Sequence, residues 1–143
     1  MRLTLREALT LAEPLRQAKV VAGAGGLDNV VGSVNVMEVP DIVNWVHAGE
    51  LLVTTMYPLH DDRAAVETLI PRLAEKGLAG LAVTMESYLE QLPPVMLEDA
   101  DRLDFPLIEL PPHVSFVDII QPLTARILDL QAEELRQSER ILR

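Results

Sequence analysis

Three short apolar runs, separated by longer segments of helical pattern, constrain most strongly how this chain can fold. The runs cover residues 51–55, 78–84 and 106–110. Short continuous apolar runs are typical of strands that are buried on both faces of a sheet. Strands that alternate with helices predict right-handed crossover units on a parallel sheet. We therefore expect an α/β domain with a small, mainly parallel sheet flanked by helices, and a protruding C-terminal helix.

The N-terminal segment carries its own boundary signals. Thr4 and Glu7 form a capping-box pattern, which predicts a helix over residues 5–12 that stops before Pro14. Residues 19–22 are expected to form a short strand that ends in a glycine turn.

Later boundaries are marked by strand, capping and proline signals. Residues 30–39 predict one or two strands, and Asp61 or Asp62 is expected to cap a long helix that ends at Gly77. A proline pair opens the next helix, which ends near residue 103. The apolar positions expected in the core are Val21, Val34, Val36, Leu52, Val53, Leu69, Leu73, Leu81, Val83, Leu97, Leu107, Ile108, Phe116 and Ile120.

The charge balance argues against two classes of direct partner. The 143 residues include 22 acidic and 12 basic side chains, which gives a net charge of −10. Nucleic acids and anionic membranes bind clustered Lys and Arg, so we expect neither to contact this chain directly. No uncharged apolar run approaches the ~20 residues of a membrane span, and no signal peptide is recognisable. We therefore expect a cytoplasmic protein.

Motifs for cofactors and metals are weak. The chain has no cysteine, which excludes disulfides and thiolate metal sites. The glycines of residues 23–26 do not continue as a dinucleotide fingerprint, because Asp28 stands where the last glycine belongs, so we interpret them as a turn. His60 and Asp62 are interpreted as a loop residue and a helix cap. We expect no cofactor and no metal.

Polar side chains gather where the predicted parallel strands end. Carboxyl ends of parallel strands share one edge of a sheet, and ligands of α/β proteins bind at this edge. We therefore predict a ligand-binding edge, in preference to ordinary loop chemistry. Its candidate contacts are Glu38, Thr54, Thr55, Tyr57, Met85 and Glu109.

The last predicted helix starts at Ser115 and changes character after about residue 130. Beyond that point it is mostly charged and polar, but Leu128, Leu135 and Leu142 recur every seven residues. Such a stripe is typical of a linker or a dimerising coil, and a solvated terminal helix is the other interpretation.

The order of several segments resembles one known family. The motifs are Val21-Ala22-Gly23-x-x-Gly26-Leu27-Asp28, Gly49-Glu50-Leu51-Leu52-Val53-Thr54-Thr55, Asp104-Phe105-Pro106-Leu107-Ile108-Glu109-Leu110-Pro111 and Val114-x-Phe116-x-Asp118-Ile119. Together they resemble the N-terminal domain of PucR-type bacterial transcription regulators, the purine catabolism regulatory protein-like domain. Residues 56–58 and 111–113 depart from the family pattern at the expected ligand edge.

The resemblance implies a regulatory role without catalytic residues. Such regulators carry this domain first, then a middle domain, and then a helix-turn-helix domain that contacts DNA. Residues 1–128 would then form the regulatory domain and residues 129–143 a helical linker toward further domains. A small effector from the purine pathway, or a partner domain, is the implied ligand, and a homodimer is expected.

Two other functions stay open at this stage. The chain could be a pure dimerisation module that binds no small molecule. It could also be an enzyme in which Glu38 and Glu109 act as acid and base, although no usual nucleophile motif is present.

Overall fold

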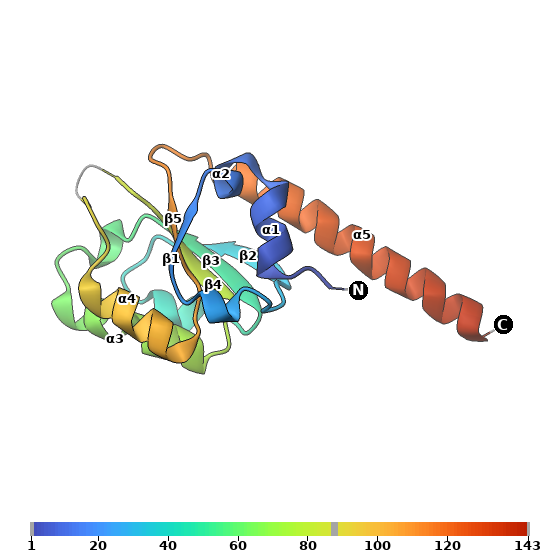
Figure 1. Cartoon of the computed structure of the whole chain (residues 1–143), viewed down its shortest axis with the longest axis horizontal. Coiled ribbons are helices and arrows are strands. Elements are labelled where there is room, and N and C mark those ends of the chain that lie inside the picture. The colour runs from blue at the N-terminus through green and yellow to red at the C-terminus, as the bar shows by residue number, and fades with distance from the viewer. Residues whose placement is uncertain (1, 87–88, 143) are drawn as a thin grey trace.

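A computed structural model describes residues 2–86 and 89–142 of the chain, and side chains through residue 140. Its sheet has five strands among the described residues, in the order β1-β5-β4-β3-β2 (Figure 1). The strands are β1 (Lys19–Ala22), β2 (Ser33–Val36), β3 (Glu50–Thr54), β4 (Gly80–Thr84) and β5 (Leu107–Leu110). The α-helices are α1 (Leu5–Leu11), α2 (Glu13–Arg16), α3 (Arg63–Glu75), α4 (Pro94–Leu103) and α5 (Val117–Leu142). The described residues also form three short 3₁₀ helices, η1 (Ala24–Gly26), η2 (Ile42–Trp45) and η3 (Tyr57–Leu59).

The sheet is mainly parallel, as predicted. Strands β2, β3, β4 and β5 run parallel and lie side by side in chain order. Strand β1 adds to the far edge antiparallel to β5, with Lys19 opposite Glu109. This arrangement brings the carboxyl ends of four strands to one edge of the sheet.

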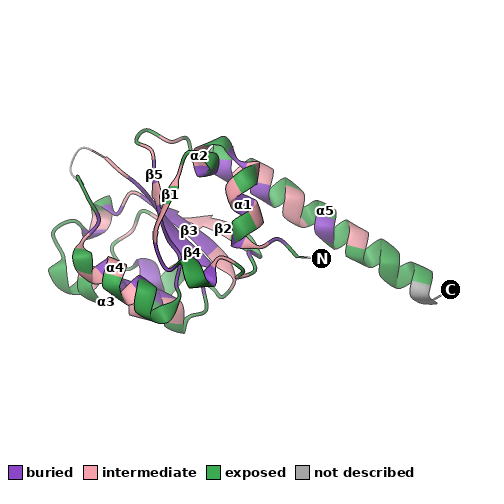
Figure 2. Cartoon of the chain, viewed as in Figure 1, coloured by how far each residue is buried: buried purple, intermediate pink, exposed green. Residues whose placement is uncertain are grey.

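Helices cover both faces of the sheet (Figures 1 and 2). Leu52, Leu81 and Leu107 pack toward α3 and α4 on one face. The alternate residues of the same strands, such as Val53 and Ile108, pack toward α1, α2 and the first half of α5. All five of these side chains are fully buried. Burial on both faces explains why these strands read as continuous apolar runs, and each such side chain contributes roughly 1.5–3 kcal/mol.

Several predicted boundaries are confirmed in atomic detail. The Thr4 hydroxyl accepts a hydrogen bond from the Glu7 amide at 3.2 Å and caps α1. Asp62 is the residue that caps α3, since its carboxylate accepts from the Ala65 amide at 3.0 Å. Gly77 follows this helix with a φ of +80°, the left-handed conformation expected after a helix end.

Helix α1 ends at Leu11 with Ala12 as its C-cap, so it stops before Pro14 as predicted, and a short helix that the sequence did not predict, α2, follows with the proline in its first turn. Residues 30–39 contain one strand, β2, which is within the one or two predicted, but Val30 lies outside it and forms an isolated bridge to Thr4. One boundary prediction was wrong, since helix α5 begins at Val117, two residues later than expected.

The predicted core is partly corrected. Eight of the fourteen expected positions are buried, and the other six are only half-buried. Three of the six lie on β1 and β2, which are the edge strands and therefore lack a neighbour on one side. The half-buried six are Val21, Val34, Val36, Leu97, Phe116 and Ile120.

The glycine turn after β1 is required by close backbone packing. Gly23 has a φ of +73°, and a Cβ there would lie 2.0 Å from the Phe105 carbonyl oxygen. Its amide donates to the Asp101 carboxylate at 2.7 Å. The turn thus joins β1 to the last turn of α4 and to the segment that follows it, which agrees with the interpretation of the glycines as a turn.

Helix α5 projects away from the sheet (Figure 1). Its first half packs on the sheet through Ile119, Leu123 and Leu130, and residues 131–140 are exposed or half-buried (Figure 2). No helix in the described part of the chain is both long and apolar enough to cross a membrane.

Candidate functional site

Polar residues do lie along the edge where the parallel strands end. Thr54 ends β3, Thr84 ends β4, and Glu38 lies two residues beyond the end of β2. Of the sequence-predicted site residues, the structure joins Glu38, Thr54, Thr55 and Tyr57 in one hydrogen-bond network.

The Glu38 carboxylate is the centre of this network. One of its oxygens accepts from the Thr54 hydroxyl at 2.9 Å and from the Thr55 amide at 2.7 Å. The other oxygen accepts from the Thr55 hydroxyl. Hydrogen bonds to an ionised acceptor are stronger than neutral ones, so the carboxylate holds the β3 end against the segment after β2.

The two threonines pass this restraint to the turn that follows β3. The Thr54 and Thr55 hydroxyls accept from the Met56 and Tyr57 amides, each at 3.1 Å. Met56 is held with a φ of +66°, an uncommon conformation for a residue with a side chain, and is buried. The network therefore fixes the backbone that presents Tyr57.

The Tyr57 ring lies at the surface beside this turn. Its side chain is 57% exposed and stacks on the His60 ring, with 4.6 Å between the ring centroids. An exposed aromatic ring on a fixed turn is a suitable contact for a flat organic ligand.

The other two predicted contacts lie on neighbouring strands. Glu109 and Thr54 share a face of the sheet, because both are cross-strand partners of Val83. Two strand spacings separate them, or about 10 Å, so Glu109 lies outside the Glu38 network. Met85 directly follows β4, packs partly into the core, and donates its amide to the Leu110 carbonyl at 3.2 Å.

Thr84 is a residue at this edge that the sequence did not single out. It is 1% exposed, and its hydroxyl has no hydrogen-bond partner within the described part of the chain. A buried unpaired hydroxyl costs about 1–3 kcal/mol. Sequence carries no signal for this feature, because the pairing of a hydroxyl depends on the packing around it.

A short loop connects the strand edge to α5. Strand β5 ends at Leu110, and a six-residue loop leads to Val117. His113 in this loop has a φ of +60°, and its Nδ1 lies 3.7 Å from the carboxylate of Glu86, just after β4. A cleft of about 490 Å³ separates this loop from α2.

The predicted leucine stripe lies at the surface. Leu128 is 57% exposed and Leu135 is 63% exposed, while the side chain of Leu142 lies outside the described residues. On the same segment of α5, the Glu133 carboxylate pairs with the Arg136 guanidinium at 2.6 Å, and this hydrogen bond lowers the pKa of the Glu133 carboxyl below its usual value.

No group of three or more potential metal ligands occurs among the residues that the structure describes. His60 instead contacts the carboxylate of Asp61 at 3.0 Å, and Asp62 caps α3.

Comparison with known proteins connects these features to one family. The model of the purine catabolism regulatory protein-like family, PucR, matches residues 7–127. The chain belongs to the PucR family. The match runs from α1 into α5, so it includes the strand edge and the loop that joins the edge to α5.

Two curated relatives are a purine catabolism regulatory protein and a transcriptional activator. The chain is 42% identical over 121 residues to the purine catabolism regulatory protein of Bacillus subtilis (strain 168), covering 85% of this chain and 23% of that protein. It is 35% identical over 106 residues to the transcriptional activator PmfR of Paenarthrobacter nicotinovorans, covering 74% of this chain and 22% of that protein. This PucR-family chain thus spans less than a quarter of the length of either relative.

Proposed function

We propose that this chain is the regulatory domain of a PucR-family transcription regulator, in which a small effector bound at the strand edge sets the pose of α5. One observation carries the proposal: six loop residues join the end of β5 to a 26-residue helix that leaves the domain body. A ligand at the edge therefore acts close to the base of the helix.

In the proposed mechanism the turn after β3 stays fixed, and the loop between β5 and α5 changes its arrangement. The Glu38 network holds the β3 turn rigidly, whereas the β5–α5 loop contains the strained residue His113 and borders an open cleft. A ligand shifts a conformational equilibrium only by its difference in affinity for the two states. We propose that the effector contacts Glu109 and Met85 and thereby favours one arrangement of this loop.

The effector is proposed to be a purine or a purine breakdown product. The Bacillus subtilis relative is named for purine catabolism, and the edge offers groups that suit a flat, hydrogen-bonding ring system. Tyr57 presents an aromatic face and Glu109 a carboxylate acceptor for ring N–H groups.

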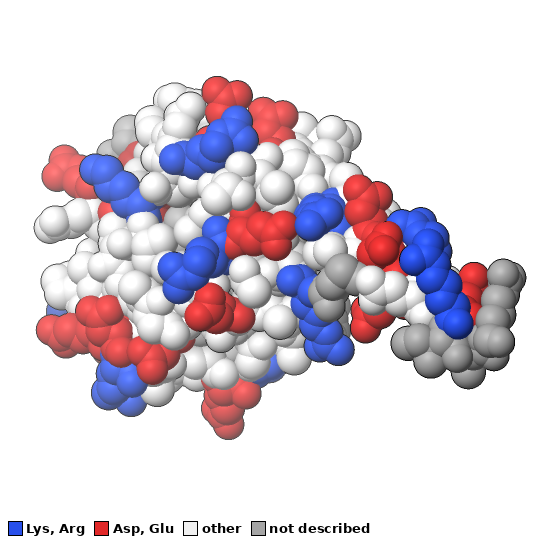
Figure 3. Space-filling view, turned by 45° about the vertical axis from the view of Figure 1, so that its right-hand side comes forward, with Lys and Arg blue, Asp and Glu red and all other residues white. Residues whose placement is uncertain are grey.

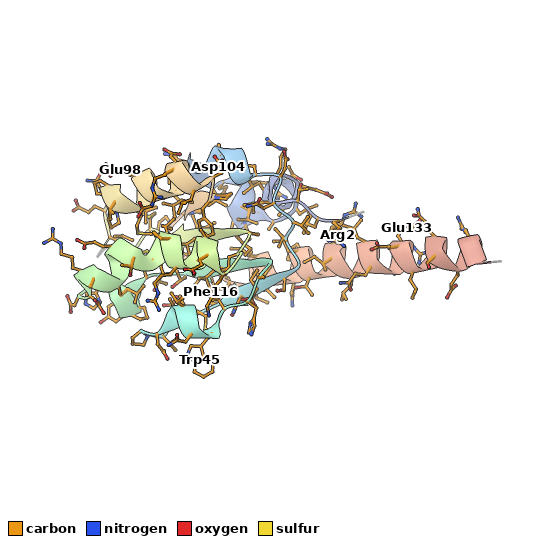
Figure 4. The ribbon with its side chains drawn as sticks, turned by 90° about the horizontal axis from the view of Figure 1, so that it is seen from below. Arg2, Trp45, Glu98, Asp104, Phe116 and Glu133 are labelled. Atoms are coloured by element: carbon orange, nitrogen blue, oxygen red, sulfur yellow. The ribbon has the colours of Figure 1, made fainter. Side chains whose placement is uncertain are left out.

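Titration calorimetry tests the effector directly. The chain is titrated with hypoxanthine, xanthine, urate and allantoin, and we expect measurable heat with at least one compound. Glu109→Gln and Tyr57→Ala should weaken that binding, whereas Glu98→Gln on the exposed side of α4 should not (Figure 4). A folded chain that gives no heat with any compound in the panel would contradict the proposal.

Residues 129–143 are proposed to act as the linker from this domain to those that follow. The last buried side chain of the described part of α5 is Leu130, so the helix leaves the body close to this boundary. The remaining length of the curated relatives is proposed to supply the DNA-binding domain, which explains how a chain of net charge −10 can serve transcription without touching DNA.

We propose no catalytic role for the two carboxylates considered as acid and base. Glu38 is engaged by three hydrogen-bond donors, and Glu109 is about two strand spacings from Thr54, one of the residues that donate to Glu38. If any turnover is found, its persistence in a Glu38→Gln, Glu109→Gln variant would exclude these residues from it.

A further inference from the structure

Helix α5 has an apolar stripe on the side that faces away from the body. Ile119 is fully buried against the sheet, and Leu128 follows it by nine residues, or about two and a half turns. Leu128 therefore points opposite to the packed side, which agrees with its 57% exposure. Leu135 continues the same side one heptad later and is 63% exposed.

Alanines complete the stripe. Ala125 and Ala132 are both exposed and alternate with the leucines at spacings of three and four residues. This is the spacing of the inner positions of a coiled coil. We call Ala125, Leu128, Ala132 and Leu135 the outer stripe of α5. Small residues between leucines let a second helix approach closely while the leucines fill the space beside them.

The charges of the protruding segment favour contact with its own copy. Residues 131–143 contain three glutamates and three arginines, so the entire net charge of −10 resides in residues 1–130. Both signs are interspersed along the described part of α5 (Figure 3). Two domain bodies repel each other, but two such helix ends do not.

We infer that a second copy of this chain binds along the outer stripe, so that two α5 helices pair outside the two domain bodies. The body packs on the opposite side of α5, through Leu123 and Leu130, so pairing leaves the packed core unchanged. The inference does not depend on effector binding, because no residue of the strand edge takes part.

The two α5 helices can pair in either of two directions, antiparallel or parallel, and the two directions bring different residues together. In an antiparallel pair whose Ala132 faces the other copy's Leu135, Asp129 of each copy comes close to Arg136 of the other. In a parallel pair, each Leu135 faces its own counterpart. In the parallel pair all four residues of the outer stripe face their counterparts, whereas in the antiparallel pair Ala132 and Leu135 face each other and Leu128 faces Glu139 of the other copy. The experiment below reports which pair forms.

Light scattering after size exclusion tests the pairing on the full chain. We expect a dimer for the unmodified chain and for Gln137→Glu, which is exposed and lies nine residues beyond Leu128 on the other side of α5. The Leu128→Glu, Leu135→Glu variant should have half that mass and keep the circular dichroism spectrum of the folded domain, because both leucines are exposed on the single chain. An unmodified chain that is monomeric, or a dimer that survives the double substitution, overturns the inference.

The absence of native cysteine makes cross-linking a clean second test. Under mild oxidation, Leu135→Cys alone should form a covalent dimer if the helices are parallel. If they are antiparallel, efficient cross-linking should require Ala132→Cys together with Leu135→Cys. Gln137→Cys is the matched control, and cross-linking of this control as efficient as that of the stripe variants contradicts pairing through the outer stripe.

Discussion

Replacement of Glu38 by alanine should destabilise the domain by about 2 kcal/mol, with the cost concentrated at one hydroxyl. The carboxylate accepts three hydrogen bonds, but Glu38 is itself exposed, so water can replace it at Thr55. Water cannot reach Thr54, which is 1% exposed, and its hydroxyl would lose its acceptor. A buried polar group left without its partner costs roughly 1–3 kcal/mol.

Urea unfolding followed by circular dichroism measures this loss. For a domain of this size, about 2 kcal/mol corresponds to roughly 4–8 °C in Tm. Glu38→Gln keeps one carbonyl oxygen as an acceptor and should lose less than Glu38→Ala. Glu98→Ala is the matched control, since this exposed glutamate on α4 makes no hydrogen bond or ion pair among the described residues, and it should change stability by less than ~0.5 kcal/mol. If Glu38→Ala is as stable as this control, the network does not hold the β3 turn.

Three further predictions concern stability. Thr84→Val should stabilise the domain by about 1 kcal/mol, because it removes a buried hydroxyl without a partner, and a lower urea midpoint would contradict this account. Gly23→Ala should cost more than ~2 kcal/mol, since Gly23 has a left-handed φ and faces Phe105, whereas Gly32→Ala, with its nearest neighbour at 3.7 Å, should fold normally. Pairing with Arg136 lowers the pKa of the Glu133 carboxyl in the folded chain. The pair therefore stabilises α5 at pH values above the pKa that Glu133 has in the unfolded chain, and this stabilisation is lost as the pH falls through the folded-state pKa. Helical circular dichroism should therefore drop on acidification more in the unmodified chain than in Glu133→Gln, and equal drops would show that the pair does not support the helix.

Sequence was sufficient to predict the central strands, because their burial on both faces leaves a continuous apolar run in each. The sequence was not sufficient to predict burial on the two edge strands of the sheet. Strands β1 and β2 have a neighbour on one side only, so Val21, Val34 and Val36 are half-buried although they are as apolar as the central residues. Asp61 and Asp62 both fit a capping pattern, and only the backbone geometry selects Asp62.

The candidate site could likewise be predicted from the sequence only in part. Strand order could be inferred from the chain, and this places polar residues at a common edge. Which of them touch depends on register: Glu38 meets Thr54 and Thr55 through a loop, while Val83 separates Thr54 from Glu109. The seven-residue leucine period was visible in sequence, but only the packing of Ile119, Leu123 and Leu130 shows that the stripe faces outward.

The central claim is that an effector at the strand edge changes the pose of α5. Pulsed electron paramagnetic resonance measures this pose directly, with spin labels at Glu98→Cys on α4 and Gln137→Cys on α5 in a chain that has no other cysteine. Dilution into unlabelled chain restricts the measurement to distances within one copy. The account predicts that the panel compound with the largest heat shifts or narrows the distance distribution, and that Glu109→Gln requires more compound for the same change. An identical distribution with and without saturating compound would contradict it.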